Sequence, residues 1–178
     1  GDGGPPDGGP AMATRGWWVS GSTEGGLRNS SRMWAESEVN GGISNTYMVL
    51  RSNGRMANGN SKSRLFQEMP ASCIYTGGRY VASAKMRVPG GVNAVGEMYV
   101  TLVGAGGGLS QEILVGTVDG AATSDWGLVS RTFTGPAGVA GCDDGGQSAC
   151  QAYVMFVVKS PNAELHVDDV WFSNEAYS

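Results

Sequence analysis

Apolar and polar residues alternate with period two in several short stretches of this chain, and clusters of Gly, Asn and Pro separate these stretches. Such alternation is typical of β-strands that bury one face. No long stretch repeats apolar residues every three to four positions, so no substantial helix is expected. Ten strands are predicted, at residues 16–20, 33–38, 46–51, 64–69, 79–88, 96–103, 112–118, 128–133, 149–159 and 163–172. This pattern indicates an all-β sandwich of two antiparallel sheets.

Three of these strands alternate cleanly enough to assign their faces. The predicted inward residues are Tyr80, Ala82, Ala84, Met86 and Val88 in the first, Met98, Val100 and Leu102 in the second, and Val154, Phe156 and Val158 in the third. If the three strands are neighbours in one sheet, its outer face carries Lys85, Arg87, Glu97, Tyr99, Gln151 and Tyr153.

Aromatic rings among long hydrogen-bonding side chains suit a carbohydrate. The apolar faces of pyranose rings stack on aromatic rings, and sugar hydroxyls need both donors and acceptors. An ordinary solvated sheet face with two scattered tyrosines explains the same pattern, so both interpretations stay open.

The last predicted strand contains a pair of adjacent carboxylates, Asp168 and Asp169. A desolvated charge without a partner costs several kcal/mol, so we expect at least one of them to be compensated. A bound cation, an arginine or backbone amides would each serve. In the same strand His166 alternates with apolar neighbours and is predicted to lie on the surface. Trp171 is predicted to project outward, as a binding platform or as an interdomain contact.

Composition excludes several classes of function. The formal net charge is -4, with no basic stripe to neutralise phosphates, so nucleic acid is not an expected partner. No run of eighteen apolar residues exists, so no membrane insertion is expected. Residues 1–12, rich in Gly, Pro and Asp, are predicted to be a linker, and residues 13–178 a single domain. Without an initiator Met, the chain is interpreted as part of a longer protein.

Cysteine usage favours an extracellular location. Cys142 and Cys150 bracket a polar turn, and a disulfide between them would stabilise the fold by roughly 2–3 kcal/mol. Such a disulfide implies an oxidising compartment. Cys73 is expected to be a buried free thiol, and no Cys/His cluster supports zinc.

Five segments in order resemble the carbohydrate-binding modules of families 4, 9 and 22, which accompany xylanases and glucanases. They are Gly16-Trp17 with Val19-Ser20-Gly21, residues 65–69, residues 76–88, Ser124-Asp125-Trp126 leading into residues 129–134, and residues 165–170. The resemblance implies a jelly-roll β-sandwich with a ligand cleft on one concave sheet face. It also implies core positions for Trp17 and Trp126.

The resemblance further implies a structural calcium ion near the chain ends, with Asp168 as a ligand. Calcium prefers oxygen ligands in irregular geometry. These families usually supply a second ligand from the Glu of an Asn-Pro-Gly-Phe-Glu stretch in the first strand, and no such stretch precedes Trp17. Glu24, Glu36 or Glu38 is a candidate substitute, or the site is incomplete.

The resulting hypothesis is a non-catalytic, extracellular carbohydrate-binding module. It would be monomeric, tethered to a larger secreted or surface protein, and bound to a polysaccharide through Tyr99 and Tyr153. A structural or adhesive module without a sugar site is the alternative from another class. A polysaccharide-degrading enzyme is a third hypothesis. It needs two facing carboxylates, a role in which Glu97 and Glu112 can be imagined.

Overall fold

A computed structural model describes residues 17–21, 32–52, 63–69, 74, 77–103, 110–136 and 151–175. These residues form ten strands, and all ten overlap the predicted ones. The strands are β1 (Trp17–Gly21), β2 (Arg32–Asn40), β3 (Ile43–Arg51), β4 (Ser63–Met69), β5 (Arg79–Arg87), β6 (Val95–Val103), β7 (Ser110–Asp119), β8 (Gly127–Thr134), β9 (Gln151–Val158) and β10 (Glu164–Asn174). A 3₁₀ turn at Pro89–Gly91 lies between β5 and β6.

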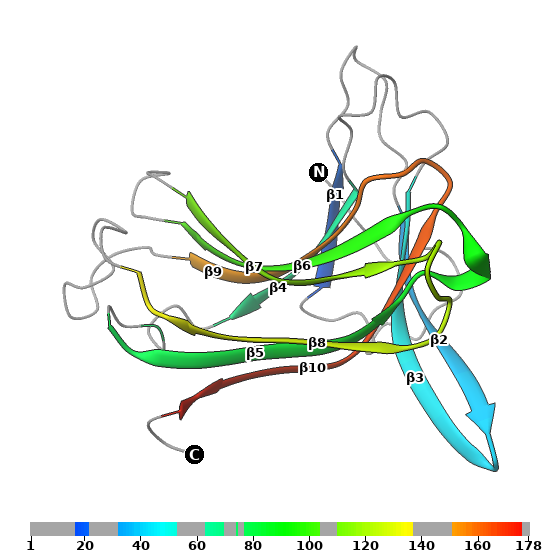
Figure 1. Cartoon of the computed structure of the whole chain (residues 1–178), viewed down its shortest axis with the longest axis horizontal. Helices are drawn as coiled ribbons and strands as arrows, with labels where there is room; N and C mark the ends of the chain where they lie inside the picture. Colours follow the sequence, from blue (N-terminus) through cyan, green and yellow to red (C-terminus); the bar gives the residue numbers. More distant parts are fainter. Residues whose placement is uncertain are drawn as a thin grey trace.

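The strands pair into two antiparallel sheets that face each other (Figure 1). One sheet has the order β1-β4-β9-β6-β7, and its outer side curves inward, so we call it the concave sheet. The other has the order β2-β3-β10-β5-β8, and we call it the convex sheet. Among the described strands, only β2–β3 and β6–β7 are consecutive strands within one sheet; every other connection crosses between the sheets. The predicted β-sandwich is confirmed.

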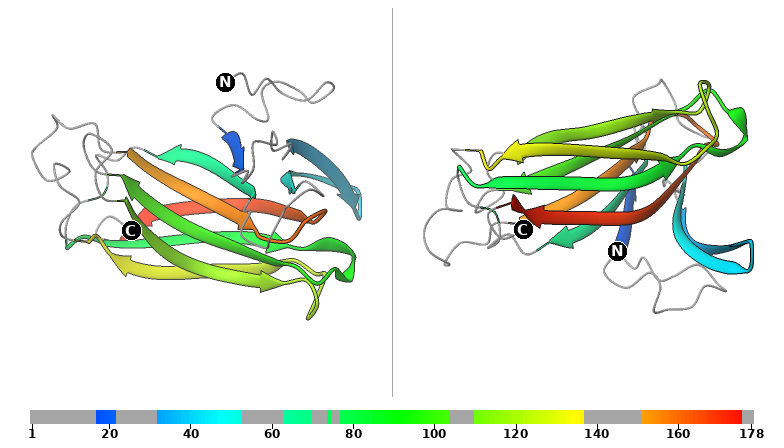
Figure 2. Two further views of the ribbon diagram at one scale, coloured as in Figure 1. Left: turned by 90° about the horizontal axis from the view of Figure 1, so that it is seen from above. Right: turned by 60° about the horizontal axis from the view of Figure 1, so that its bottom comes forward.

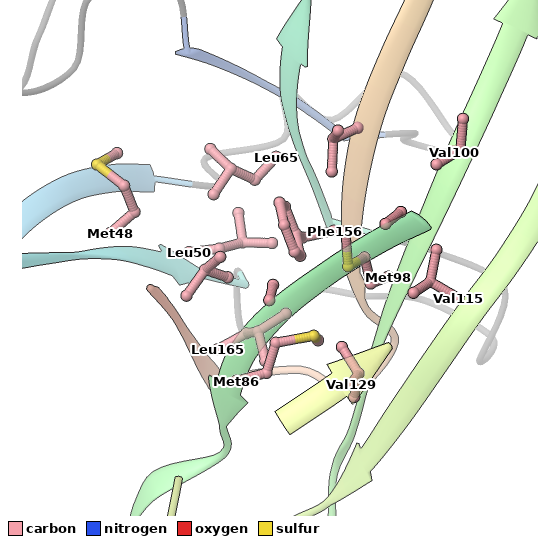
Figure 3. Close-up of a cluster of buried hydrophobic side chains, with 14 of the residues drawn as sticks. Met48, Leu50, Leu65, Met86, Met98, Val100, Val115, Val129, Phe156 and Leu165 are labelled. Carbon is pink, nitrogen blue, oxygen red and sulfur yellow. The ribbon is translucent and has the colours of Figure 1, made fainter. Parts of the chain in front are cut away.

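The core lies between the inner faces of the two sheets (Figure 3). All eleven residues assigned inward from the alternation of three strands are buried in this core. Both sheets contribute large side chains, which include Leu65, Met98 and Phe156 from the concave sheet and Leu50, Met86 and Leu165 from the convex sheet. Trp17 packs against the same layer, with its ring centroid 6.0 Å from that of Phe156, as expected.

The β2–β3 hairpin extends further than predicted and projects beyond the rest of the sandwich (Figure 1). Its two strands pair from Arg32 opposite Arg51 to Asn40 opposite Ile43. Gly41 and Gly42 form the turn with φ of 59° and 85°. A two-residue turn with positive φ at both positions matches the twist of the strands, and glycine adopts it without steric cost.

The strand β10 is the middle strand of the convex sheet (Figure 2). A β-bulge interrupts it between Asp168 and Trp171. Asp169 has a φ of 46°, which is unusual for a residue with a side chain. Before the bulge, Leu165 and Val167 point into the core, and after it Val170 and Phe172 pack against the core. The bulge therefore reverses the alternation of the strand.

The predicted linker, Glu24 and the three cysteines all lie outside the described residues. The linker and the disulfide therefore stay predictions. Within the described parts of the chain, no helix is long and apolar enough to cross a membrane.

Gly96 of β6 provides a test of the packing between the sheets. A Cβ at this position would overlap the fully buried side chain of Leu165 and lie 3.2 Å from Cγ2 of Val118. We expect Gly96→Ala to lower the free energy of unfolding by about 1–3 kcal/mol, because overpacking forces its neighbours to move. This corresponds to a fall in Tm of about 2–12 °C. Thermal unfolding followed by circular dichroism measures it.

Gly127→Ala is the matched control, since a Cβ there would make only ordinary contacts, the nearest 3.5 Å from Cγ1 of Val118. Equal Tm values for the two variants would contradict the close approach of β6 to Leu165.

Candidate functional site

The sheet topology separates the six predicted binding residues into two groups. Glu97, Tyr99, Gln151 and Tyr153 lie on β6 and β9 of the concave sheet, whereas Lys85 and Arg87 lie on β5 of the convex sheet. The outer faces of the two sheets point in opposite directions (Figure 1). The prediction that all six share one face is therefore wrong. Alternation assigns a residue to the inside or the outside of a sandwich, but not to a sheet.

Two tyrosines lie close together on the outer side of the concave sheet, which we call the concave face. Tyr99 of β6 pairs with Met155 of β9, and Tyr153 is two residues from Met155 on the same strand. Such diagonal positions are about 7–8 Å apart. Phe66 of β4 also pairs with Met155, and its ring packs edge-on to that of Tyr153 with centroids 6.0 Å apart. Three aromatic residues thus surround Met155.

A neutralised charge lies beside these rings. The carboxylate of Glu97 is 7% exposed, and its Oε1 lies 2.6 Å from Nζ of Lys159. The hydroxyl of Tyr99 donates to the other oxygen, Oε2, at 2.8 Å. Burial, followed by this hydrogen bond and the charges of Glu97 and Glu112, raises the pKa of Tyr99 to about 12. Tyr99 is therefore a neutral hydrogen-bond donor at physiological pH.

The floor of the concave face is largely closed to water. Met155 and Val157 are buried although they point away from the core. Thr101, which pairs with Tyr153, is 7% exposed, and its hydroxyl has no hydrogen-bond partner among the described residues. The side chain of Gln151 lies outside the described residues, although its backbone pairs with Val103 at the end of β9. The concave face thus combines an apolar floor with polar groups at a few positions.

On the convex sheet, Arg87 is engaged by its own neighbours. Its guanidinium carbon lies 5.1 Å from the ring centroid of Tyr47 and 4.4 Å from that of Trp126. It donates to Oε2 of Glu38 at 3.1 Å and to Nδ1 of His166 at 3.0 Å. We call these five residues the arginine cluster. Because these four neighbours engage the guanidinium of Arg87, its role is structural.

The arginine cluster corrects two further predictions. His166 is 5% exposed rather than on the surface, because the ring of Tyr47 stacks on it with centroids 4.8 Å apart. Trp126 was expected in the core. Its ring instead packs edge-on to Tyr47 on the outer side of the convex sheet, and its indole N–H donates to Glu38 at 3.4 Å.

The described residues around Asp168 do not fit a calcium site. Oδ2 of Asp168 accepts a hydrogen bond from the side-chain amide of Asn45 at 2.7 Å, and Oδ1 accepts one from the backbone N–H of Asp169 at 2.8 Å. Asp169 forms an ion pair with Nζ of Lys85 at 2.7 Å. Hydrogen-bond donors and an ammonium group thus occupy the places where a cation would bind.

The other candidate ligands do not complete a metal site. Glu36 accepts hydrogen bonds from Trp34 and Tyr47, and Glu38 is held in the arginine cluster. No group of three His, Cys, Asp or Glu side chains gathers within the part of the chain that the structure describes. A pocket of about 250 Å³ opens beside Asp168, between the ends of the two sheets. Calcium binding stays a prediction that rests on the resemblance.

The sequence did not predict the residues that contact the site residues from other parts of the chain. Phe66, Tyr47 and Lys159 approach the site residues from strands or loops far away in the sequence. Only the strand order reveals these contacts. The alternation of 64–69 and 46–51 could have marked Phe66 and Tyr47 as outward residues, but not what they touch.

No family model matches the chain, and no curated protein sequence matches it. Solved structures do match. The C-terminal family 22 carbohydrate-binding module of Clostridium thermocellum xylanase 10B aligns with a TM-score of 0.60 and 11% identity, over 92% of this chain and 87% of that chain. A family 22 xylan-binding domain from Paenibacillus barcinonensis aligns with a TM-score of 0.57 and 11% identity, over 90% of this chain and 92% of that chain.

A third match is the enzymatically active domain of tailspike protein 4 from bacteriophage CBA120. It aligns with a TM-score of 0.56 and 11% identity over 90% of this chain, but this chain spans only 19% of that chain. At such identities the likeness shows the fold alone. The fold is that of the family 22 modules, which confirms the fold implied by the sequence resemblance.

His166 makes the stability of the arginine cluster depend on pH. Its Nδ1 accepts from Arg87, and its Nε2 lies 3.1 Å from Oε2 of Glu164, so the ring is neutral with the proton on Nε2. Burial lowers the pKa of His166, and the charge of Arg87 acts in the same direction, against the carboxylates of Glu164 and Glu36. The unfolded state therefore takes up the proton first, and stability falls as pH decreases below about 6.5.

We expect the Tm of the wild type to fall more between pH 7.5 and pH 5.5 than the Tm of His166→Gln, which cannot take up this proton. Glu36 does not contribute in this range, because the hydrogen bond from Trp34 lowers its pKa below 4.5. Thermal unfolding at several pH values measures the difference. Parallel curves for the two proteins would contradict the neutral, buried imidazole.

Proposed function

We propose that this protein is a non-catalytic carbohydrate-binding module that holds a polysaccharide chain on its concave face. The observation that carries the proposal is the placement of Tyr99 and Tyr153 as diagonal neighbours on that face, beside Phe66. Half-buried aromatic rings held in fixed positions offer flat apolar surfaces to the C–H faces of sugars. The solved structures with the same fold, which include xylan-binding domains, support this function.

Polar groups near the rings suit the hydroxyls of a neutral sugar. Glu97 and Lys159 neutralise each other, and the Tyr99 hydroxyl donates to Glu97, which leaves its oxygen as an acceptor for a sugar hydroxyl. Sites of this kind bind with Kd values of roughly 1 µM to 1 mM, or about 4–8 kcal/mol. Lys85 and Arg87 take no part, because they lie on the opposite side of the sandwich.

The contacts of Glu97 argue for binding rather than hydrolysis. A glycosidase needs two carboxyl groups that face the sugar across a cleft. Both oxygens of Glu97 are instead engaged within the fold, Oε1 by the ammonium of Lys159 and Oε2 by the hydroxyl of Tyr99. The proposed module therefore keeps its glycan intact and acts by holding a tethered partner near it, outside the cell or at its surface.

Binding is tested by affinity electrophoresis through gels that contain xylan, mixed-linkage β-glucan, mannan, alginate or pectin. We expect one or more of the neutral glycans to retard the wild type. The double variant Tyr99→Ala/Tyr153→Ala should bind with at least ten-fold lower affinity, a loss of about 1.4 kcal/mol or more, because both stacking surfaces are removed.

Ile43→Ala is the matched control, since Ile43 is 74% exposed at the hairpin tip and far from the concave face in sequence and sheet. Unchanged Tm values show that all variants fold. Absence of retardation in every gel would contradict the proposal and favour a structural or adhesive module.

The absence of catalysis is tested with the glycan that gives the strongest retardation. We expect no reducing ends to accumulate during prolonged incubation, with wild type and Glu97→Gln indistinguishable. A steady release of reducing ends by the wild type, lost in Glu97→Gln, would assign the concave face to a hydrolase.

A further inference from the structure

The outer side of the convex sheet carries an exposed indole on the strand β10. Trp171 lies on β10, the middle strand of the sheet, and is 62% exposed. Across the sheet it pairs with Ser83 of β5, and Ser83 pairs with Ser130 of β8. Because both serines are small, they do not cover the ring. On the other side of β10, β3 pairs only with residues 164–167, so it does not reach Trp171. A large apolar side chain thus faces water.

The β-bulge in β10 directs Trp171 outward. Leu165 and Val167 point into the core, so uninterrupted alternation would turn Trp171 inward as well. The extra residue at Asp168 and Asp169 reverses this order. As a result, Val170 and Phe172 pack against the core, and the largest side chain of the segment is exposed.

The bulge is held in place by specific contacts, although it requires an unfavourable backbone conformation. A non-glycine residue with positive φ, such as Asp169, costs of order 1–3 kcal/mol. Its backbone N–H donates to Asp168, and its carboxylate forms the ion pair with Lys85 of the neighbouring strand. Local strain that the surroundings hold in place often marks a functional position.

The surface around Trp171 has the chemistry of a glycan platform. Next to the row of Trp171, Ser83 and Ser130 comes a row of Ser173, Val81 and Thr132. We call these six residues the indole platform. Its hydroxyls can donate and accept hydrogen bonds, and the indole offers a flat apolar surface.

The charges at the border of the indole platform indicate a neutral ligand. None of its six residues is charged. Lys85 at one side is paired with Asp169, and the carboxylate of Asp168 beside it leaves this border slightly negative. The carboxylate of Asp168 would repel a polyanion. A cationic partner could not form an ion pair with Asp169, because Lys85 already does so. A neutral polysaccharide is complementary to this surface.

We propose that the indole platform is a second binding surface for neutral polysaccharide, on the opposite side of the sandwich from the concave face. It goes beyond the function proposed above, because it makes the module bivalent. Because the two surfaces point in opposite directions, the module would bind two different glycan chains at the same time.

The test compares four proteins in gels that contain xylan, mixed-linkage β-glucan or mannan: the wild type, Tyr99→Ala/Tyr153→Ala, Trp171→Ala, and the triple variant. We expect the double variant to keep measurable retardation and the triple variant to lose it, with at least a ten-fold difference in affinity. Trp171→Phe should restore part of the binding, because it restores an aromatic ring. Ile43→Ala, which removes an apolar residue that is also largely exposed, should behave as wild type.

Bivalency provides an independent readout. The wild type should cross-link the soluble glycan that retards it, seen as a rise in viscosity or turbidity, whereas Trp171→Ala should bind without cross-linking. Complete loss of retardation in Tyr99→Ala/Tyr153→Ala would overturn the second surface and leave the concave-face proposal intact. If the variants that lack Trp171 lose retardation and Tyr99→Ala/Tyr153→Ala keeps wild-type retardation, the result would support the indole platform and contradict the concave-face site.

Two other outcomes overturn the inference. Sedimentation of the wild type as a dimer that Trp171→Ala dissociates would assign the platform to self-association. Failure of all three neutral glycans to retard the wild type would reject both surfaces.

Discussion

The apolar layer between the two sheets is the interaction on which the other features depend. Side chains such as Met86, Phe156 and Leu165 fill it from both sides, and every strand contributes one face to it or packs at its edge (Figure 3). Burying large apolar side chains of this kind contributes about 1.5–3 kcal/mol each. A sandwich held in this way has two outer faces that can never meet, so each polar residue of a strand belongs to one face or the other.

This constraint explains which parts of the molecule were predictable. Period-two alternation identified the strands and their inward residues, because burial of one face is a local property. The strand order depends on contacts between residues far apart, so Lys85 and Glu97 were placed on one face although β5 and β6 belong to different sheets. The surface position predicted for His166 failed for a related reason. Alternation places it outside the core, but only strand pairing brings Tyr47 and Trp126 over it.

On both outer faces, several neighbouring groups compensate a partly buried charge. On the concave face, Glu97 is satisfied by Lys159 and Tyr99, and on the convex sheet Arg87 is satisfied by Glu38, His166 and two rings. Partly buried charges persist when several partners compensate them at once. On the concave face the rings of Tyr99 and Tyr153 lie beside an ion pair, whereas in the arginine cluster two rings cover a cation. The first arrangement suits a ligand, and the second suits rigidity.

The position of β10 has a consequence for how the domain forms. Although β10 follows all other described strands in the chain, it lies between β3 and β5, and its contact with Asn45 joins residues 123 positions apart. Until β10 is present, the β2–β3 hairpin and the β5–β8 pair have no common neighbour, and both present unpaired backbone edges. The convex sheet therefore cannot be completed before β10 has joined it. Nascent chains that stop before residue 164 would lack β10 and carry two open edges, and we expect them to be recognised by chaperones or to associate with one another.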